Sequence, residues 1–110
     1  MVAQYVPDAG DLIWLEFDPQ LGPEQSGRRQ AVVLSPAAYN RVTGLAICCP
    51  TTTKIKGYPF EVALSGTPAA VVLSDQVRSL DWRARKASRK GVVTARELAE
   101  IRGKLRALIG

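Results

Sequence analysis

Short apolar segments separated by turn residues recur through the first eighty positions of the chain. Residues 11–17 alternate so that Ile13, Leu15 and Phe17 share one apolar face, which is typical of a strand, and residues 31–35 form a continuous apolar run expected of a central strand. Further short strands are predicted over residues 45–49, 60–64, 71–73 and 76–80. Strands this short and this closely spaced predict a small, strongly bent barrel.

The pattern changes to a helical period near the end of the chain. Thr94 and Glu97 stand at the spacing of a capping box, and Leu98, Ile101, Leu105 and Leu108 follow on one face. Glu100 and Lys104 form an i,i+4 pair. We expect a structural helix that packs on the barrel or on a partner subunit, with Arg96, Arg102 and Arg106 on a solvated face. A short helical turn is expected over residues 36–40.

Composition and length favour one domain over residues 1–110, mainly β with a C-terminal helix. The chain has 110 residues, of which 46% are hydrophobic and 23% charged. It has no apolar run near the roughly 18–20 residues that span a bilayer. The first residues have neither the basic start nor the apolar stretch of a signal peptide. We therefore expect a cytoplasmic protein.

The formal net charge of +5 is unevenly distributed. Residues 1–50 carry three basic and five acidic side chains, whereas residues 51–110 carry twelve and five. Six basic residues lie between Arg78 and Lys90, against the single acid Asp81. Such a patch favours a polyanion as partner. The alternative is a solvated basic face that serves solubility.

Residues 18–28 contain two Pro and two Gly and are expected to form a long loop. At its end, the sequence Gly27-Arg28-Arg29-Gln30 leads into the central strand. Loops of this length in a small domain are usually functional or disordered. An arginine delivered from a loop can hold a fixed positive charge over a phosphate, because guanidinium stays protonated and forks onto anionic oxygens. Alternatively, Arg29 pairs with Asp11, Glu16 or Glu24 in a structural salt bridge.

The chain contains no histidine, which excludes Ser-His-Asp and Cys-His catalysis. Cys48 and Cys49 are adjacent, so that in a strand they point to opposite faces; we expect one buried and one partly exposed thiol, with no disulfide and no metal site. Of the two indoles, Trp14 is expected in the core, while Trp82 suits either a core or base stacking.

RNA cleavage is a reaction that a chain without histidine or a metal site can catalyse, because RNA carries its own nucleophile, the 2′-hydroxyl.

Several motifs occur in the order found in MazF/PemK-type toxins: DLIW (11–14), FDP (17–19), GPEQSGRR (22–29), AVVLSP (31–36), PTTT (50–53), KGYPFEV (56–62) and DQVRS (75–79). The resemblance covers nearly the whole chain. It implies a sequence-specific endoribonuclease toxin of a bacterial type II toxin–antitoxin pair, with an SH3-like barrel that acts as a homodimer. It also implies single-stranded RNA as substrate, no cofactor, and a cognate acidic antitoxin (MazE-like) that neutralises the toxin.

The resemblance also implies roles for individual residues. Arg29 matches the family's catalytic arginine, Thr52 its catalytic threonine, and Glu24 a glutamate of the same mobile loop. The remaining expected RNA contacts are Gln25, Arg28, Lys56, Gln76 and Arg83. One departure is Gln30, where the family usually has a proline; the change frees φ and restores an N–H.

Other interpretations remain open at this point. The Thr52 hydroxyl suits a turn cap, which is compatible with catalysis. Glu24 is either a catalytic acceptor, a base-reading contact or a solvated loop acid. At the level of function, small barrels of this architecture include toxins that clamp DNA gyrase without cutting anything, and nucleic-acid-binding modules with no activity.

Overall fold

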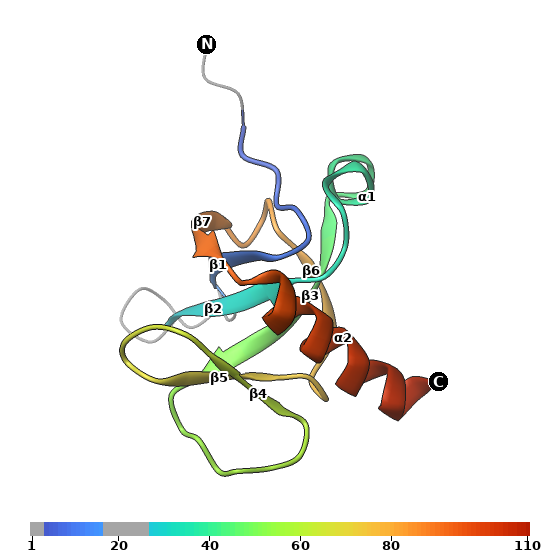
Figure 1. The fold of residues 1–110 in the computed structure, drawn as a ribbon. Coiled ribbons are helices and arrows are strands. Elements are labelled where there is room, and N and C mark those ends of the chain that lie inside the picture. Colours follow the sequence, from blue (N-terminus) through green and yellow to red (C-terminus); the bar gives the residue numbers. More distant parts are fainter. Residues whose placement is uncertain (1–3, 17–26) are drawn as a thin grey trace.

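A computed structural model describes residues 4–16 and 27–110 of the chain. Seven strands and two helices follow in the order β1 (Asp11–Glu16), β2 (Arg28–Val33), α1 (Ala37–Thr43), β3 (Leu45–Thr52), β4 (Glu61–Leu64), β5 (Ala70–Leu73), β6 (Arg78–Asp81), β7 (Ser88–Val92) and α2 (Ala95–Ile109). The predicted class, mainly β with a C-terminal helix, is confirmed (Figure 1).

The strands form one curled antiparallel sheet in the order β4-β5-β3-β2-β1-β7, with β6 paired to the first half of β3. Strand β7 was not predicted from the sequence. Its residues Ser88-Arg89-Lys90-Gly91-Val92 show no apolar alternation, because the strand lies at the sheet edge, and its pairing with β1 includes an irregularity between Leu12 and Ile13. A charged edge strand of this kind also discourages pairing with other chains.

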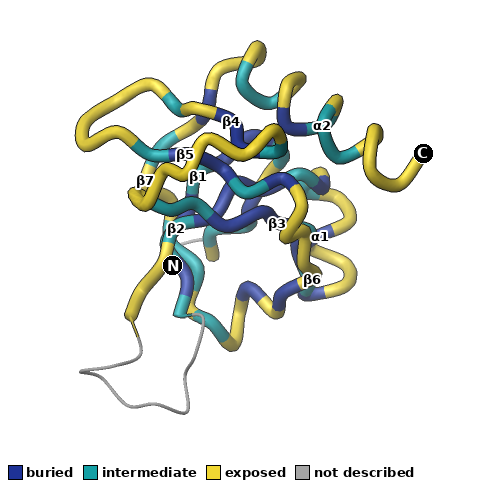
Figure 2. The backbone as a smooth tube through the Cα atoms, turned by 90° about the horizontal axis from the view of Figure 1, so that it is seen from below, coloured by how far each residue is buried: buried dark blue, intermediate teal, exposed yellow. Residues whose placement is uncertain are grey.

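The central strands β2 and β3 are covered on both faces. Alternate residues enter two clusters: Ala31 and Val33 pack in the first with Ile13, Leu15 and Trp82, whereas Val32 packs in the second with Val62, Val72 and Ile101. Figure 2 shows the buried segments along these strands and the exposed residues in the loops and on the outer side of α2. A strand buried on both faces reads as a continuous apolar run, as residues 31–35 do.

The two-sided cover corrects the expectation for the cysteines. Cys48 belongs to the first cluster and Cys49 to the second, and their exposed fractions are 1% and 0%. Both are free thiols, and burial raises the pKa of each to about 12. The prediction of opposite faces and no disulfide is confirmed, but the prediction of a partly exposed thiol is wrong, because neither face of β3 is open at this point.

The structure decides the open alternative for Trp82 and differs from the expectation for Trp14. Trp82 is 2% exposed, and its Nε1 donates to the Asn40 carbonyl at 2.9 Å, so it is a core residue and not a stacking platform. Trp14 is only partly buried and belongs to neither cluster. On β1 it pairs with Gln30 of β2 and Ser88 of β7.

Helix α2 begins with the predicted capping box. Thr94 Oγ1 accepts from the Glu97 N–H at 3.0 Å, and Glu97 Oε1 accepts from the Thr94 N–H at 2.8 Å. Leu98 and Ile101 pack in the second cluster, which places the helix on the barrel, and the Lys104–Glu100 pair is present at 3.5 Å. The prediction of a solvated Arg102 is wrong, because its Nη2 donates to the Leu34 carbonyl at 3.1 Å.

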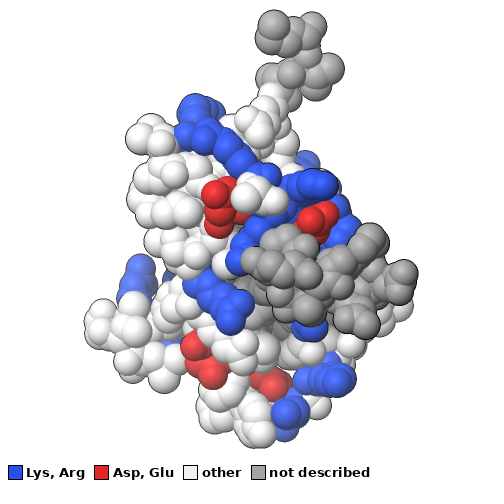
Figure 3. Space-filling model, turned by 180° about the vertical axis from the view of Figure 1, so that it is seen from behind, with Lys and Arg blue, Asp and Glu red and all other residues white. Residues whose placement is uncertain are grey.

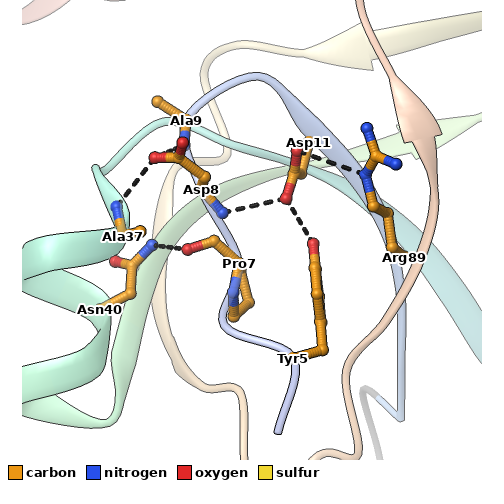
Figure 4. A network of polar contacts seen from close by, with 8 residues as sticks. All are labelled: Tyr5, Pro7, Asp8, Ala9, Asp11, Ala37, Asn40 and Arg89. Carbon is orange, nitrogen blue, oxygen red and sulfur yellow. Dashed lines mark hydrogen bonds and ion pairs between the residues drawn. The ribbon is translucent and has the colours of Figure 1, made fainter. Parts of the chain in front are cut away.

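The N-terminal segment is fastened by polar contacts (Figure 4). The Asp11 carboxylate accepts from the Tyr5 hydroxyl at 2.5 Å and from the Asp8 N–H at 3.0 Å, and its other oxygen lies 3.7 Å from Arg89 Nε. Asn40 Nδ2 donates to the Pro7 carbonyl at 2.7 Å. These contacts join the chain before β1 to α1 and β7, and they give Asp11 partners other than Arg29.

The stability contributed by Glu97 is expected to depend on pH. Its Oε2 also accepts from the Ser65 N–H at 2.7 Å. Burial raises the pKa of Glu97, but the backbone hydrogen bonds from Thr94 and Ser65 outweigh it and hold the pKa below its ordinary value of 4.5. The stabilisation is therefore complete above the unfolded-state pKa and is lost as pH falls through the lowered, folded-state pKa.

We expect Glu97→Gln to lower the free energy of unfolding at neutral pH by about 0.5 kcal/mol, because an anion at a helix N-terminus is lost. Urea unfolding of wild type and variant across the acidic range measures the difference, which should shrink as the wild-type carboxylate becomes protonated. A difference that stays constant would contradict the assignment.

Candidate functional site

The register of the central strands brings Arg29 and Thr52 to neighbouring positions. Strands β2 and β3 pair through Ala31↔Pro50, Val32↔Cys49 and Val33↔Cys48. Continued toward the open ends of both strands, this antiparallel register sets Arg29 across from Thr52. Thr51 Oγ1 lies 3.4 Å from the Gln30 carbonyl, so the two chains still run side by side there. Two residues far apart in the sequence thus reach the same end of the sheet.

Arg29 is the second residue of β2, not part of a loop as expected from the sequence. It pairs with Leu15 of β1, and its side chain is exposed. Within residues 4–16 and 27–110 it takes part in no salt bridge, including with Asp11 or Glu16. The strand therefore fixes the arginine backbone and leaves the guanidinium open for a ligand.

Thr52 ends β3 at the start of the loop that leads to β4. Its Oγ1 accepts from the Lys54 N–H at 3.0 Å, so the turn-capping role considered for this hydroxyl is present. A hydroxyl that accepts one hydrogen bond keeps its own proton for donation. Capping therefore orients the hydroxyl and leaves it able to bind an anionic oxygen.

Thr52 lines a pocket of about 180 Å³ together with two of the predicted RNA-contact residues, Lys56 and Gln76. The rest of the lining comprises Lys54, Tyr58, Phe60, Glu61 and Leu73. The pocket thus joins two cations, two aromatic rings and a hydroxyl, the groups that bind single-stranded nucleic acid through phosphate charge and base stacking. Lys54, Tyr58 and Phe60 were not among the predicted site residues, although the KGYPFEV motif contains both aromatics.

Two predicted RNA contacts lie elsewhere. Arg28 Nη2 donates to Ser88 Oγ at 2.6 Å, which holds the side chain toward β7. Arg83 follows β6, whose last residue Asp81 pairs with Leu45, so it lies near the opposite end of β3 from Thr52. Its guanidinium stacks 4.7 Å from the Trp82 ring and donates to the Arg41 carbonyl at 3.0 Å. The structure does not bring Arg83 into the pocket.

The remaining predicted site residues, Glu24 and Gln25, lie outside the described residues, and their roles stay predictions. On the face seen in Figure 3, Lys and Arg side chains are widely spread, and acidic side chains lie beside several of them. Across the described parts of the chain, no group of three or more His, Cys, Asp or Glu side chains could hold a metal ion, and no helix is long and apolar enough to cross a membrane.

Known proteins match the chain over its whole length. The family described as "PemK-like, MazF-like toxin of type II toxin-antitoxin system" matches residues 8–109. A relative named endoribonuclease toxin MazF, from Escherichia coli strain K12, is 58% identical over 111 residues, covering 100% of both chains.

Solved structures agree with this match. MazF from Deinococcus radiodurans superposes with a TM-score of 0.87 at 59% identity, covering 97% of this chain and 99% of that one. A MazE–MazF structure from the same organism gives a TM-score of 0.87 at 54% identity, covering 97% and 98%.

The capping contact of Thr52 can be separated from any other role of its hydroxyl. We expect Thr52→Val to speed hydrogen exchange at the Lys54 amide, because the amide loses its acceptor, whereas Thr52→Ser should leave that exchange unchanged. Nuclear magnetic resonance measures both. Unchanged exchange in the valine variant would show that the cap does not hold this turn in solution.

Proposed function

The chain belongs to the PemK-like, MazF-like toxins of type II toxin–antitoxin systems, and from this membership we propose that it cleaves single-stranded RNA, mRNA in particular, at specific sequences. The observation that carries the proposal for this chain is the register of β2 and β3, which, continued two residues beyond its last pair, Ala31↔Pro50, sets Arg29 across from Thr52. The capped Thr52 hydroxyl lines a pocket with aromatic and cationic walls, and Arg29 takes part in no salt bridge among the described residues.

The proposed reaction is an internal transesterification. The 2′-hydroxyl oxygen forms a bond to the adjacent phosphorus, the bond from phosphorus to the 5′-oxygen breaks, and the proton lost by the nucleophile is balanced by one taken up on the leaving oxygen. The products are a 2′,3′-cyclic phosphate and a 5′-hydroxyl. Because the substrate brings its own nucleophile, the protein needs to align it and to stabilise the phosphorane.

Arg29 and Thr52 supply that stabilisation in this scheme. The Arg29 guanidinium binds the phosphorane oxygens as a planar fork and assists protonation of the 5′-oxygen. It is a poor general base, since arginine stays protonated below a pH of about 12. Thr52 donates a hydrogen bond to a non-bridging oxygen. Glu24 either accepts from the 2′-hydroxyl and so aligns it, or reads a base.

RNA binding is assigned to Gln25, Arg28, Lys56, Gln76 and Arg83, of which Lys56 and Gln76 share the pocket with Thr52. Arg28 and Arg83 lie outside the pocket and would act on more distant phosphates through charge, in a salt-dependent way. No metal or organic cofactor enters the scheme, because every group it needs is a side chain or part of the RNA. The mRNA substrate is also the reason to propose action in the cytoplasm.

Two protein partners complete the proposal. One is an acidic, MazE-like antitoxin, supported by the MazE–MazF structure that this chain resembles and by the positive charge of residues 51–110. The other is a second copy of the chain. Leu108 and Ile109 are 57% and 71% exposed, and Ile109 lines a largely apolar groove with Leu34, Ile47 and Leu105. A homodimer would cover these side chains.

Removing one oxygen atom of the substrate tests whether the 2′-hydroxyl is the nucleophile. Replacing the ribose just 5′ of the scissile phosphate by deoxyribose should abolish cutting, because the attacking oxygen is removed, while binding stays nearly intact. Cleavage of the all-ribose RNA should proceed in excess EDTA. Cutting of the deoxy substrate would mean that water attacks, and absence of any RNA cleavage would favour a non-catalytic toxin.

The two neighbouring arginines should respond differently to substitution. Arg29→Ala should lower the cleavage rate by about 10²-fold or more, because one preorganised transition-state donor is lost. Arg29→Lys should stay slow, since an ammonium does not reproduce the fork. Arg28→Ala is the matched control, because it removes the same charge at the adjacent residue. It should mainly weaken binding, and the loss should shrink as the salt concentration rises. Equal, small losses in both alanine variants would reduce Arg29 to a general electrostatic role.

A further inference from the structure

The loop between β3 and β4, residues 53–60, is closed by the side chain of Glu61, which starts β4. Glu61 is 9% exposed, and its Oε2 and Oε1 accept from the Lys56 and Gly57 N–H groups at 3.2 and 3.0 Å. The Glu61 N–H donates to the Tyr58 carbonyl at 3.1 Å, which closes the same turn through the main chain. One carboxylate therefore holds two successive peptide groups of the loop.

Glu61 is in turn anchored to the helix. Lys104 Nζ of α2 donates to the Glu61 carbonyl at 2.8 Å, and Val62, the next residue, packs with Ile101 in the second cluster. Figure 1 shows that the loop is long and contains no helix or strand between β3 and β4. Its order consequently depends on what fastens it at its base.

The fastened loop carries one wall of the pocket at Thr52. Lys56 Nζ lies 5.9 Å from the centre of the Tyr58 ring, and the Tyr58 and Phe60 rings are 5.3 Å apart. Gly57, between the cation and the rings, has a φ of +78°, a conformation that glycine adopts without strain. The Glu61 hydrogen bonds act on this segment, at Lys56 and Gly57, so they decide where the cation and Tyr58 point.

We propose that Glu61 is a positioning residue for RNA, whose carboxylate preorganises Lys56 and Tyr58 to bind nucleotides next to the scissile phosphate. The inference rests on the proposed function, because it assigns those nucleotides to the pocket that Thr52 shares. A loop that is already ordered loses less conformational entropy when RNA binds than a free loop would. Loss of the Glu61 carboxylate should therefore lower the affinity for RNA and leave the rate of the chemical step unchanged.

The sign of the effect separates this role from simple electrostatics. A negative charge in a groove for a polyanion opposes binding, and its removal alone should tighten the complex. A positioning role predicts the opposite, since losing the carboxylate releases the loop. Glu61→Gln is the informative variant because it keeps the size of the side chain, removes the charge and replaces one acceptor oxygen by an amide that cannot accept.

The first measurement uses RNA that carries the mapped cut site, in all-ribose form for kinetics and with a deoxyribose at the cut site for binding. We expect Glu61→Gln to raise both KM and the Kd of the deoxy RNA by about tenfold, the scale of a lost hydrogen bond to a charged group, with kcat nearly unchanged. The control is Asp8→Asn, which makes the same charge change at an exposed residue before β1 that has no contact with Glu61 or Lys104. It should leave KM unchanged or slightly lower.

The second measurement, hydrogen exchange, does not depend on activity, and its first part uses the wild-type protein alone. In the wild-type protein the Lys56 and Gly57 amides should exchange far more slowly than unprotected amides. In Glu61→Gln they should exchange at least about tenfold faster, while the Val72 amide of the second cluster keeps its rate. Unprotected exchange at Lys56 and Gly57 in the wild type would overturn the proposal even if the variant did not fold.

Two further outcomes would overturn it. RNA affinity in Glu61→Gln equal to or above that of the wild type would leave only the electrostatic effect. A lower kcat with unchanged KM would place Glu61 in the chemistry. A wild-type protein that neither binds nor cuts RNA would instead overturn the proposed function, and the exchange rates would then show separately whether the carboxylate holds the loop.

Discussion

The antiparallel pairing of β2 with β3 is the constraint on which both the core and the candidate site depend. Because these central strands are covered on both faces, a slip of one residue would exchange the two clusters and bury the wrong side chains. The register is therefore strongly specified. The same register sets Arg29 and Thr52 opposite each other at the open end of the strands, so the packing of the core fixes the relative position of the two proposed catalytic groups.

At that end of the sheet, the strands provide a rigid backbone and the neighbouring loop provides charged and aromatic side chains. The strands hold the backbones of Arg29 and Thr52, while the loop of residues 53–60 presents a cation and aromatic rings to the pocket. Helix α2 reaches this loop through the contact from Lys104 to Glu61. A helix that the sequence presents as purely structural is thus coupled, by one hydrogen bond and one buried carboxylate, to the surface proposed to bind RNA.

Buried polar groups elsewhere serve the fold. Asn40 donates to the carbonyls of Pro7 and Ser35, and Trp82 donates to the carbonyl of Asn40 itself, so one asparagine joins the N-terminal segment, α1 and the first cluster. The sequence left the role of Trp82 open between base stacking and core packing. Its hydrogen bond to Asn40 holds the indole in the core. Its neighbour Arg83 lies over the ring and does not line the pocket.

The sequence by itself determined the class of fold, the capping box of α2, the opposite faces of Cys48 and Cys49, and the resemblance that identified Arg29 and Thr52 as a pair. These follow from periodicity, short-range spacing and motif order, which are local properties of a chain. Tertiary structure decided the rest. Strand β7 exists because β1 offers it a partner, and Cys49 is buried because β4, β5 and α2 cover that face. Arg83 is separated from Thr52 by the length of β3, and Glu61 is anchored because Lys104 of α2 reaches its carbonyl. None of these has a local signature, since each depends on which distant segment lies alongside.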